Sequence, residues 1–99
     1  MQKFRDLDNA TYVAPTAEHP NPWLLVEEFR RGASYAKAAG FDGVELHGAN
    51  GYLFAQFFDP VSNQRTDEWG GSMEKRAKFI LECLKVVIDV FGADRVGIK

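Results

Sequence analysis

The chain has 99 residues, of which 45% are hydrophobic and 26% are charged, as expected for one ordinary globular unit rather than a disordered segment. Twelve Lys and Arg against fourteen Asp and Glu give a formal net charge of -2, which argues against nucleic acid as a partner. The single cysteine cannot form an internal disulfide, and no apolar run approaches the roughly 18 residues of a membrane span. Because the N-terminus lacks the apolar core of a signal peptide, we expect a cytoplasmic location.

Residues 1–22 contain three of the four prolines and few regularly spaced apolar residues, which predicts an extended lead-in. A single structural unit over residues 23–99 is expected to follow. Asn21 is placed to cap a first helix, and Pro22 suits the first helical position because its missing N–H needs no partner there. An apolar stripe at steps of three and four then predicts a helix that ends near Ala39. Its members are Val26, Phe29, Ala33 and Ala36.

A glycine is expected to end each predicted helix. Gly40 can adopt the left-handed conformation that follows a last turn, and Phe41 can fold back onto the helix. Ser72 is a good N-cap for a second helix, which should run to about Phe91 before Gly92 ends it. The broad apolar face of this second helix is predicted to comprise Ala77, Ile80, Leu81, Leu84, Val87, Ile88 and Phe91.

Two short strands are predicted, at residues 43–46 and 95–99, and each follows a helix through a short turn. The order helix, strand, long loop, helix, strand predicts an α/β fold with parallel strands and a right-handed crossover. Such a pair is a piece of a larger α/β sheet or barrel, because parallel strands are normally covered on both faces and paired on both edges. The open strand edges also predict self-association.

Successive side chains of a strand face opposite ways, so Val44 and Leu46 should pack against the helices. Glu45, His47 and Lys99 should then lie on the inner face. His47 and Lys99 end neighbouring parallel strands, at the edge where α/β folds hold their ligands. The same parity assigns Val96 and Ile98 to the helix side and Gly97 to the inner side.

The glycine-rich turn of residues 47–52, HGANGY, holds the residues best suited to chemistry. The imidazole of His47 and the amide of Asn50 can converge on one acceptor atom, such as a carbonyl or nitro oxygen. Tyr52 adds a phenol that can donate a proton. Alternatively, His47 and Asn50 satisfy backbone groups of the turn, and Tyr52 is an amphipathic core residue.

The polar loop of residues 59–71 is long enough to suggest a function. Arg65, Asp67 and Glu68 could form a phosphate or metal site, but they are better suited to folding the loop and fastening it to the second helix. No set of His, Cys, Asp and Glu has the spacing of metal ligands. Cys83 lies within the second predicted helix and is expected to serve packing.

Three stretches together resemble the Old Yellow Enzyme family of FMN-dependent ene reductases, which includes the oxophytodienoate reductases. These are residues 39–53, AGFDGVELHGANGYL; residues 62–72, SNQRTDEWGGS; and residues 95–99, RVGIK. The resemblance runs from near Val26 to the end of the chain. It implies a segment of a (β/α)8 barrel, a TIM barrel of roughly 250 residues or more.

The resemblance also implies roles for the site residues. His47 and Asn50 would hydrogen-bond the oxygen of an α,β-unsaturated carbonyl or nitro compound, Tyr52 would protonate the α-carbon, and NAD(P)H would reduce the flavin. Lys99 stands where the family usually has an arginine beside the flavin, and a lysine lacks the planar donor fork of arginine. A competing interpretation pairs Lys99 with Glu45 on the inner face.

Two further hypotheses stay open at the level of sequence. The chain can be a truncated, catalytically inactive fragment that binds no flavin, because a barrel needs far more residues. It can also be an interaction module in which a partner covers the aromatic residues after the motif. These residues are Phe54, Phe57, Phe58 and Trp69.

Overall fold

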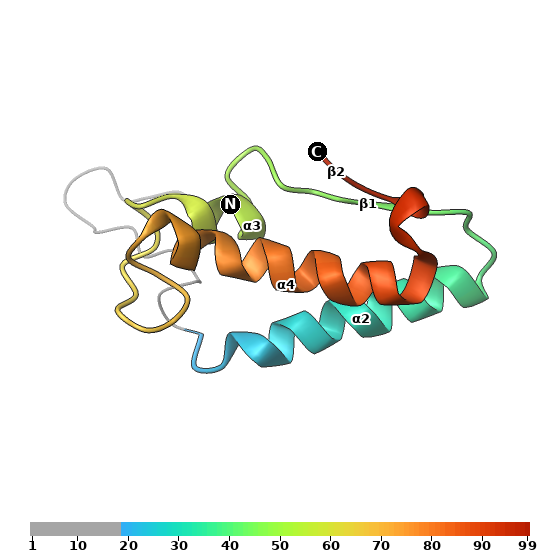
Figure 1. The fold of residues 1–99 in the computed structure, drawn as a ribbon, viewed down its shortest axis with the longest axis horizontal. Helices are drawn as coiled ribbons and strands as arrows, with labels where there is room; N and C mark the ends of the chain where they lie inside the picture. Colours follow the sequence, from blue (N-terminus) through green and yellow to red (C-terminus); the bar gives the residue numbers. More distant parts are fainter. Residues whose placement is uncertain (1–18) are drawn as a thin grey trace, which may run out of the picture.

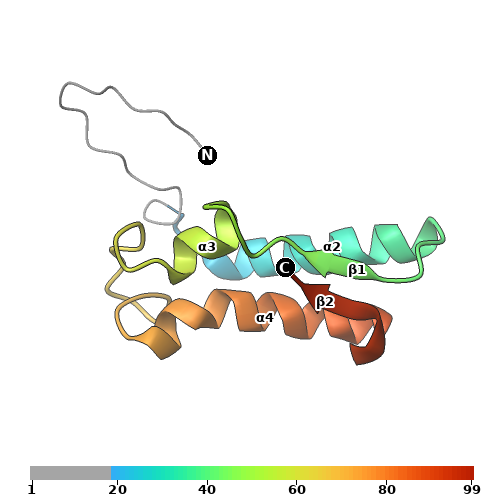
Figure 2. The ribbon, with the colours of Figure 1, turned by 90° about the horizontal axis from the view of Figure 1, so that it is seen from above.

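The computed structural model describes residues 19–99, so most of the predicted lead-in over residues 1–22 lies outside the described part of the chain. Two long helices lie side by side and run in the same direction, and two short strands return over them (Figures 1 and 2). In chain order the elements are α2 (Pro22–Ala38), β1 (Val44–Leu46), α3 (Leu53–Phe58), α4 (Met73–Phe91), the 3-10 turn η1 (Ala93–Arg95) and β2 (Val96–Ile98). None of these helices is long and apolar enough to cross a membrane, as far as residues 19–99 show.

The ends of α2 follow the local signals of the sequence. The side chain of Asn21 accepts a hydrogen bond from the backbone N–H of Trp23 at 3.2 Å, and Pro22 occupies the first turn. At the other end Gly40 has a φ of 98°, and its N–H donates to the carbonyl of Lys37. The ring of Phe41 stays 65% exposed, so the predicted packing of this ring on the helix is wrong and the backbone alone closes the helix.

The ends of α4 also follow the local signals of the sequence. The hydroxyl of Ser72 accepts from the N–H of Lys75 at 3.2 Å, and Glu74 lies in the first turn, near the positive end of the helix dipole. Gly92, with a φ of 93°, follows the last helical residue. The predicted start and end of this helix are therefore confirmed.

The strands β1 and β2 pair in parallel, with Leu46 opposite Ile98. Val44 is partly buried and Leu46 is buried against the helices, whereas Glu45 is exposed, as the strand alternation predicts. On β2 only Val96 packs against the core. Ile98 is 44% exposed, and its side chain lies beside Gly48.

Aromatic side chains form the centre of the core between α2, α3 and α4. The rings of Phe57 and Phe79 stack with centroids 4.1 Å apart, and Phe29 contacts Phe54 at 4.9 Å. Phe54, Phe57 and Trp69 are all almost completely buried. Three of the four aromatic residues assigned to a partner-binding surface thus belong to the core of the chain itself, and only Phe58 is substantially exposed.

The helix α3 was absent from the predicted order of elements. Its six residues, LFAQFF, are too few to show a helical period, and Tyr52 at its start offers no side-chain cap. The short helix forms because it buries Phe54 and Phe57 against α4. Tertiary packing rather than local sequence determines this element.

The buried face of α4 also differs from the prediction. Val87 is buried, and Ile80, Leu84 and Phe91 pack against the core, as predicted. However, α4 also buries Phe79, Cys83 and Val86, which were not assigned to its apolar face, and the predicted Leu81 is 52% exposed. Because α4 carries apolar residues on most of its circumference, periodicity alone could not identify the face that meets α2.

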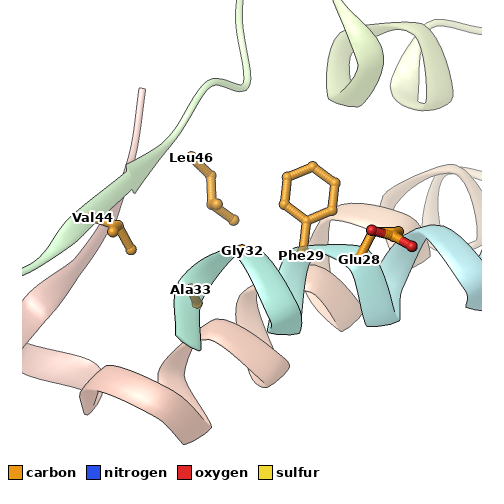
Figure 3. Close-up of a pocket in the computed structure, with 6 residues that line it drawn as sticks. All are labelled: Glu28, Phe29, Gly32, Ala33, Val44 and Leu46. Carbon is orange, nitrogen blue, oxygen red and sulfur yellow. The ribbon is translucent and has the colours of Figure 1, made fainter. Parts of the chain in front are cut away.

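Apolar surface is left open beside β1. Figure 3 shows Val44 and Leu46 pointing from β1 toward α2, where Phe29, Gly32 and Ala33 lie. These residues line a hollow of about 350 Å³ together with Glu28. The hollow lies on the helix side of β1, the opposite face from His47, so it is not the site indicated by the HGANGY turn.

Candidate functional site

The turn of residues 47–52 is fixed to the end of β2 by backbone hydrogen bonds. The N–H of Lys99 donates to the carbonyl of Leu46 at 3.0 Å, and the N–H of Gly48 donates to the carbonyl of Lys99 at 2.9 Å. These bonds extend the parallel ladder by one residue and bring His47 beside Lys99. The structure thus confirms that both residues lie at the carboxyl ends of neighbouring parallel strands.

Gly48 leaves little room between the two strand ends. A Cβ atom at position 48 would lie 3.0 Å from the carbonyl oxygen of Lys99 and 3.1 Å from the side chain of Ile98. A larger residue would therefore require these two neighbours to move by a few tenths of an ångström.

Asn50 and Gly51 reverse the chain after the strand. Their φ angles are 63° and 77°, and Asn50 is the non-glycine residue with a positive φ among residues 19–99. Asparagine tolerates this left-handed conformation better than most residues do. The reversal leaves the side chain of Asn50 exposed on the turn, three residues from His47.

Tyr52 stands directly before α3, and its ring lies beside that of His47. The two ring centroids are 5.2 Å apart with an angle of 42° between the planes. Tyr52 is 48% exposed, so the alternative that it is a core residue does not hold. The turn therefore carries an imidazole, an amide and a phenol on one solvent-accessible edge of the fold.

Lys99 is exposed at the same edge. The competing interpretation as an ion-pair partner of Glu45 finds no support, because no ion pair shorter than 4.0 Å between residues 19 and 99 joins the two. The role of Lys99 toward a cofactor stays a prediction.

The loop of residues 59–71 is folded by its own polar side chains, as predicted. The guanidinium of Arg65 forms a bidentate ion pair with the carboxylate of Asp67, with N–O distances of 3.1 and 2.9 Å. It also donates to the carbonyl of His19 at 2.9 Å. The hydrogen bond from Arg65 lowers the pKa of Asp67 below its ordinary value. Glu68 reaches Lys78 of α4 at 3.5 Å, which fastens the loop to that helix.

Two buried side-chain amides were not predicted from the sequence. Gln56 lies within the apolar run LFAQFF, and Asn63 lies in the loop; they are 6% and 4% exposed. Asn63 donates to the carbonyls of Phe57 and Trp69 and accepts from the N–H of Arg65. Gln56 could have been found from the sequence as the one amide inside an otherwise apolar run. A buried polar group needs hydrogen-bond partners, so such an amide predicts a specific bond in the folded chain.

Cys83 is completely buried in the core, as its predicted packing role requires. Burial raises the pKa of its thiol to about 12, and the charge of Glu82 adds to this shift. Within residues 19–99 there is also no group of three or more His, Cys, Asp or Glu side chains that could hold a metal ion.

The sequence profile of the NADH:flavin oxidoreductase / NADH oxidase family matches residues 24–99. The chain belongs to this family. This assignment confirms the resemblance to the Old Yellow Enzymes, and it makes FMN the cofactor of the family and a reduced nicotinamide its reductant.

Individual relatives agree with the family assignment. A putative 12-oxophytodienoate reductase of Oryza sativa subsp. japonica is 55% identical over 75 residues, which cover 76% of this chain and 20% of the rice protein. A probable flavin mononucleotide-dependent alkene reductase of Leishmania infantum is 55% identical over 92 residues, which cover 85% of this chain and 25% of the relative.

The fold agrees as well. A structure of morphinone reductase in complex with tetrahydroNAD superposes with a TM-score of 0.78 at 49% identity, over 82% of this chain and 22% of that protein. The predicted α/β fold, a partial (β/α)8 barrel segment, is thereby confirmed. The chain spans about a fifth to a quarter of the length of the relatives that it matches.

The described residues fit one edge of a bound FMN. Imidazole, amide, phenol and ammonium groups are all exposed at the carboxyl ends of β1 and β2, and such donors suit an electron-rich flavin ring and a carbonyl oxygen. The glycines of residues 48–51 and 70–71 form no phosphate-binding fingerprint. The fit therefore concerns the ring and the substrate, and not the flavin phosphate.

Proposed function

We propose that this chain supplies the substrate-binding and proton-donating edge of an FMN-dependent NAD(P)H ene reductase. The substrates are α,β-unsaturated carbonyl or nitro compounds, and the activated C=C bond is reduced. The observation that carries the proposal is the placement of His47 and Tyr52, whose rings lie 5.2 Å apart at the strand edge where Lys99 also stands. The alkene reductase and oxophytodienoate reductase relatives support the same class of reaction.

His47 and Asn50 would bind the electron-withdrawing oxygen of the substrate. Two N–H donors on one oxygen draw electron density out of the conjugated C=C bond and make its β-carbon electrophilic. Bound FMN, reduced by NAD(P)H, would supply the hydride that this carbon accepts. Lys99 would place a positive charge beside the flavin ring and favour its negatively charged reduced form.

Tyr52 would complete the reduction by protonating the α-carbon. A phenol can donate its proton to a carbon that carries developing negative charge. Because Tyr52 is 48% exposed, water can return the proton after each turnover. The substrate thus gains one hydride and one proton, while NAD(P)H is oxidised.

The test uses the product of the complete gene, loaded with FMN. We expect NAD(P)H oxidation under anaerobic conditions to depend on an added cyclic enone or nitroalkene, and the reduced alkene to accumulate in equal amount. Oxidation of NAD(P)H without alkene reduction would refute the proposal. Lys99→Met should weaken FMN binding, measured by flavin fluorescence, whereas Lys85→Met on the outer side of α4 should not.

A second candidate applies to the 99-residue chain by itself. Within residues 19–99, β1 and β2 each have an unpaired edge in the two-stranded sheet, and apolar side chains such as Leu81 and Val61 are exposed. These features favour an inactive fragment that self-associates or binds another protein. The purified chain would then show no bound-flavin absorbance and would form oligomers in light scattering.

A further inference from the structure

Gln56 is the one polar residue of α3, and it is buried. It is 6% exposed, and its neighbours Phe54 and Phe57 belong to the core. Burying an amide in such a place destabilises a protein unless the amide is hydrogen-bonded. The partners of Gln56 therefore indicate why an amide occupies this position.

Both donors of Gln56 bind the turn that carries the candidate site. Its backbone N–H donates to the carbonyl of Tyr52 at 2.8 Å, and its side-chain Nε2 donates to the carbonyl of Gly51 at 2.9 Å. These two carbonyls belong to the peptide units on either side of the Tyr52 Cα atom. Since peptide units are planar, holding both of them fixes the direction of the Cα–Cβ bond of Tyr52, from which the phenol extends.

The conformation of the turn makes such a hold useful. Asn50 and Gly51 are consecutive residues with positive φ, and although asparagine tolerates this conformation better than most residues do, it still favours contacts that stabilise it. No other side chain within residues 19–99 donates to the backbone of residues 49–52 among the hydrogen bonds of the structure. The amide of Gln56 is thus the side-chain restraint on this turn.

The other half of the amide argues against a purely stabilising role. The Oε1 atom of Gln56 is buried without a hydrogen-bond partner in the described part of the chain. Rotating the amide would turn this oxygen toward the carbonyl of Gly51 and place two acceptors together, so the orientation is fixed. An apolar residue would avoid a buried oxygen without a partner, and stability alone does not explain a glutamine here.

We propose that Gln56 is a positioning residue that holds Asn50 and Tyr52 in place for alkene reduction. The inference rests on the proposed function for its effect on catalysis, but the restraint itself can be measured without any activity. Gln64 provides a matched control. Its side-chain amide also donates to backbone carbonyls, those of Pro60 and Val61, but it is exposed in the loop of residues 59–71.

The first experiment measures backbone hydrogen exchange in the FMN-loaded product of the complete gene. Gln56→Leu should speed exchange of the hydrogen-bonded N–H groups at the two ends of the turn, those of Gly48 and residue 56, by about tenfold, the cost of one lost hydrogen bond, and leave α4 unchanged. Gln64→Leu should leave these two N–H groups unchanged. Equal acceleration in α4, or no acceleration at Gly48 and residue 56, would overturn the proposal.

The second experiment uses Gln56→Glu, which keeps the size of the side chain. A protonated carboxyl can donate to the carbonyl of Gly51, whereas a carboxylate is repelled by it, and burial raises the pKa of such a group. The rate of enone reduction by Gln56→Glu, relative to the unaltered protein, should therefore rise as the pH falls from about 8 to about 5. The rise should be mainly in kcat. Gln56→Leu should show a lower kcat without this recovery.

A lack of pH-dependent recovery in Gln56→Glu, or an unchanged kcat in Gln56→Leu, would overturn the positioning role. Failure of the proposed function gives a different result. In that case the unaltered protein would reduce no enone, while hydrogen exchange at Gly48 and residue 56 would still respond to Gln56→Leu.

Discussion

Replacing Asn63 by leucine should destabilise the protein far more than the same change at the next residue. Asn63 is 4% exposed and makes three hydrogen bonds, to the carbonyls of Phe57 and Trp69 at 2.6 and 2.9 Å and from the N–H of Arg65 at 3.0 Å. Leucine is similar in size but leaves all three backbone groups without this partner. At about 1 kcal/mol for each bond, the loss of unfolding free energy is about 3 kcal/mol.

The assay is thermal unfolding of the FMN-loaded product of the complete gene, followed by circular dichroism. With a shift of roughly 2 °C for each kcal/mol, Asn63→Leu should lower the midpoint by about 6 °C. Gln64→Leu also removes two side-chain hydrogen bonds, but from exposed carbonyls, and should cost less than about 0.5 kcal/mol. Equal shifts for the two variants would refute the reasoning that burial decides the cost.

Three further predictions follow from the structure. Tyr52→Phe should lower kcat for enone reduction by about a hundredfold or more while FMN stays bound, and an unchanged kcat would exclude Tyr52 as the proton donor. The pKa of Asp67 lies below its ordinary value of 3.8, because Arg65 hydrogen-bonds its carboxylate, so its contribution to stability is present above pH 3.8 and is lost as the pH falls through the lowered pKa. Asp67→Asn should therefore lower the thermal midpoint near neutral pH and have less effect in acid; an equal effect at both would contradict this assignment. Cys83, with a pKa of about 12 and no exposed surface, should resist iodoacetamide in the native protein at about pH 8 and react in denaturant, and rapid native labelling would show that the core around it opens readily.

Features that depend on neighbouring residues could be predicted from the sequence. Asn21 and Ser72 cap the helices that follow them, and Gly40 and Gly92 end the same helices. Each of these signals acts within about one helical turn, so no distant part of the chain can override it easily. The position of the HGANGY turn could likewise be predicted, because the strand pattern placed its first residue, His47, at the end of a strand.

Features that depend on distant contacts could not be predicted. The helix α3 and the face that α4 buries are both decided by the packing of Phe54 and Phe57 on Phe79. The roles of Gln56 and Asn63 follow from the positions of backbone carbonyls that only the folded chain brings together. Hydrophobic burial is favourable whichever apolar residues meet. A run of apolar residues is therefore compatible with several different packing arrangements.

The sequence by itself determined the helix ends, the parallel strand pair and the family. Only the tertiary structure decided that Leu46 pairs with Ile98 and that the carbonyl of Lys99 accepts from Gly48. That register brings His47 to the same edge as Lys99, while α3 places Tyr52 beside His47. The physical reason is that strand register and side-chain direction are fixed by hydrogen bonds between segments about fifty residues apart, which no local signal encodes.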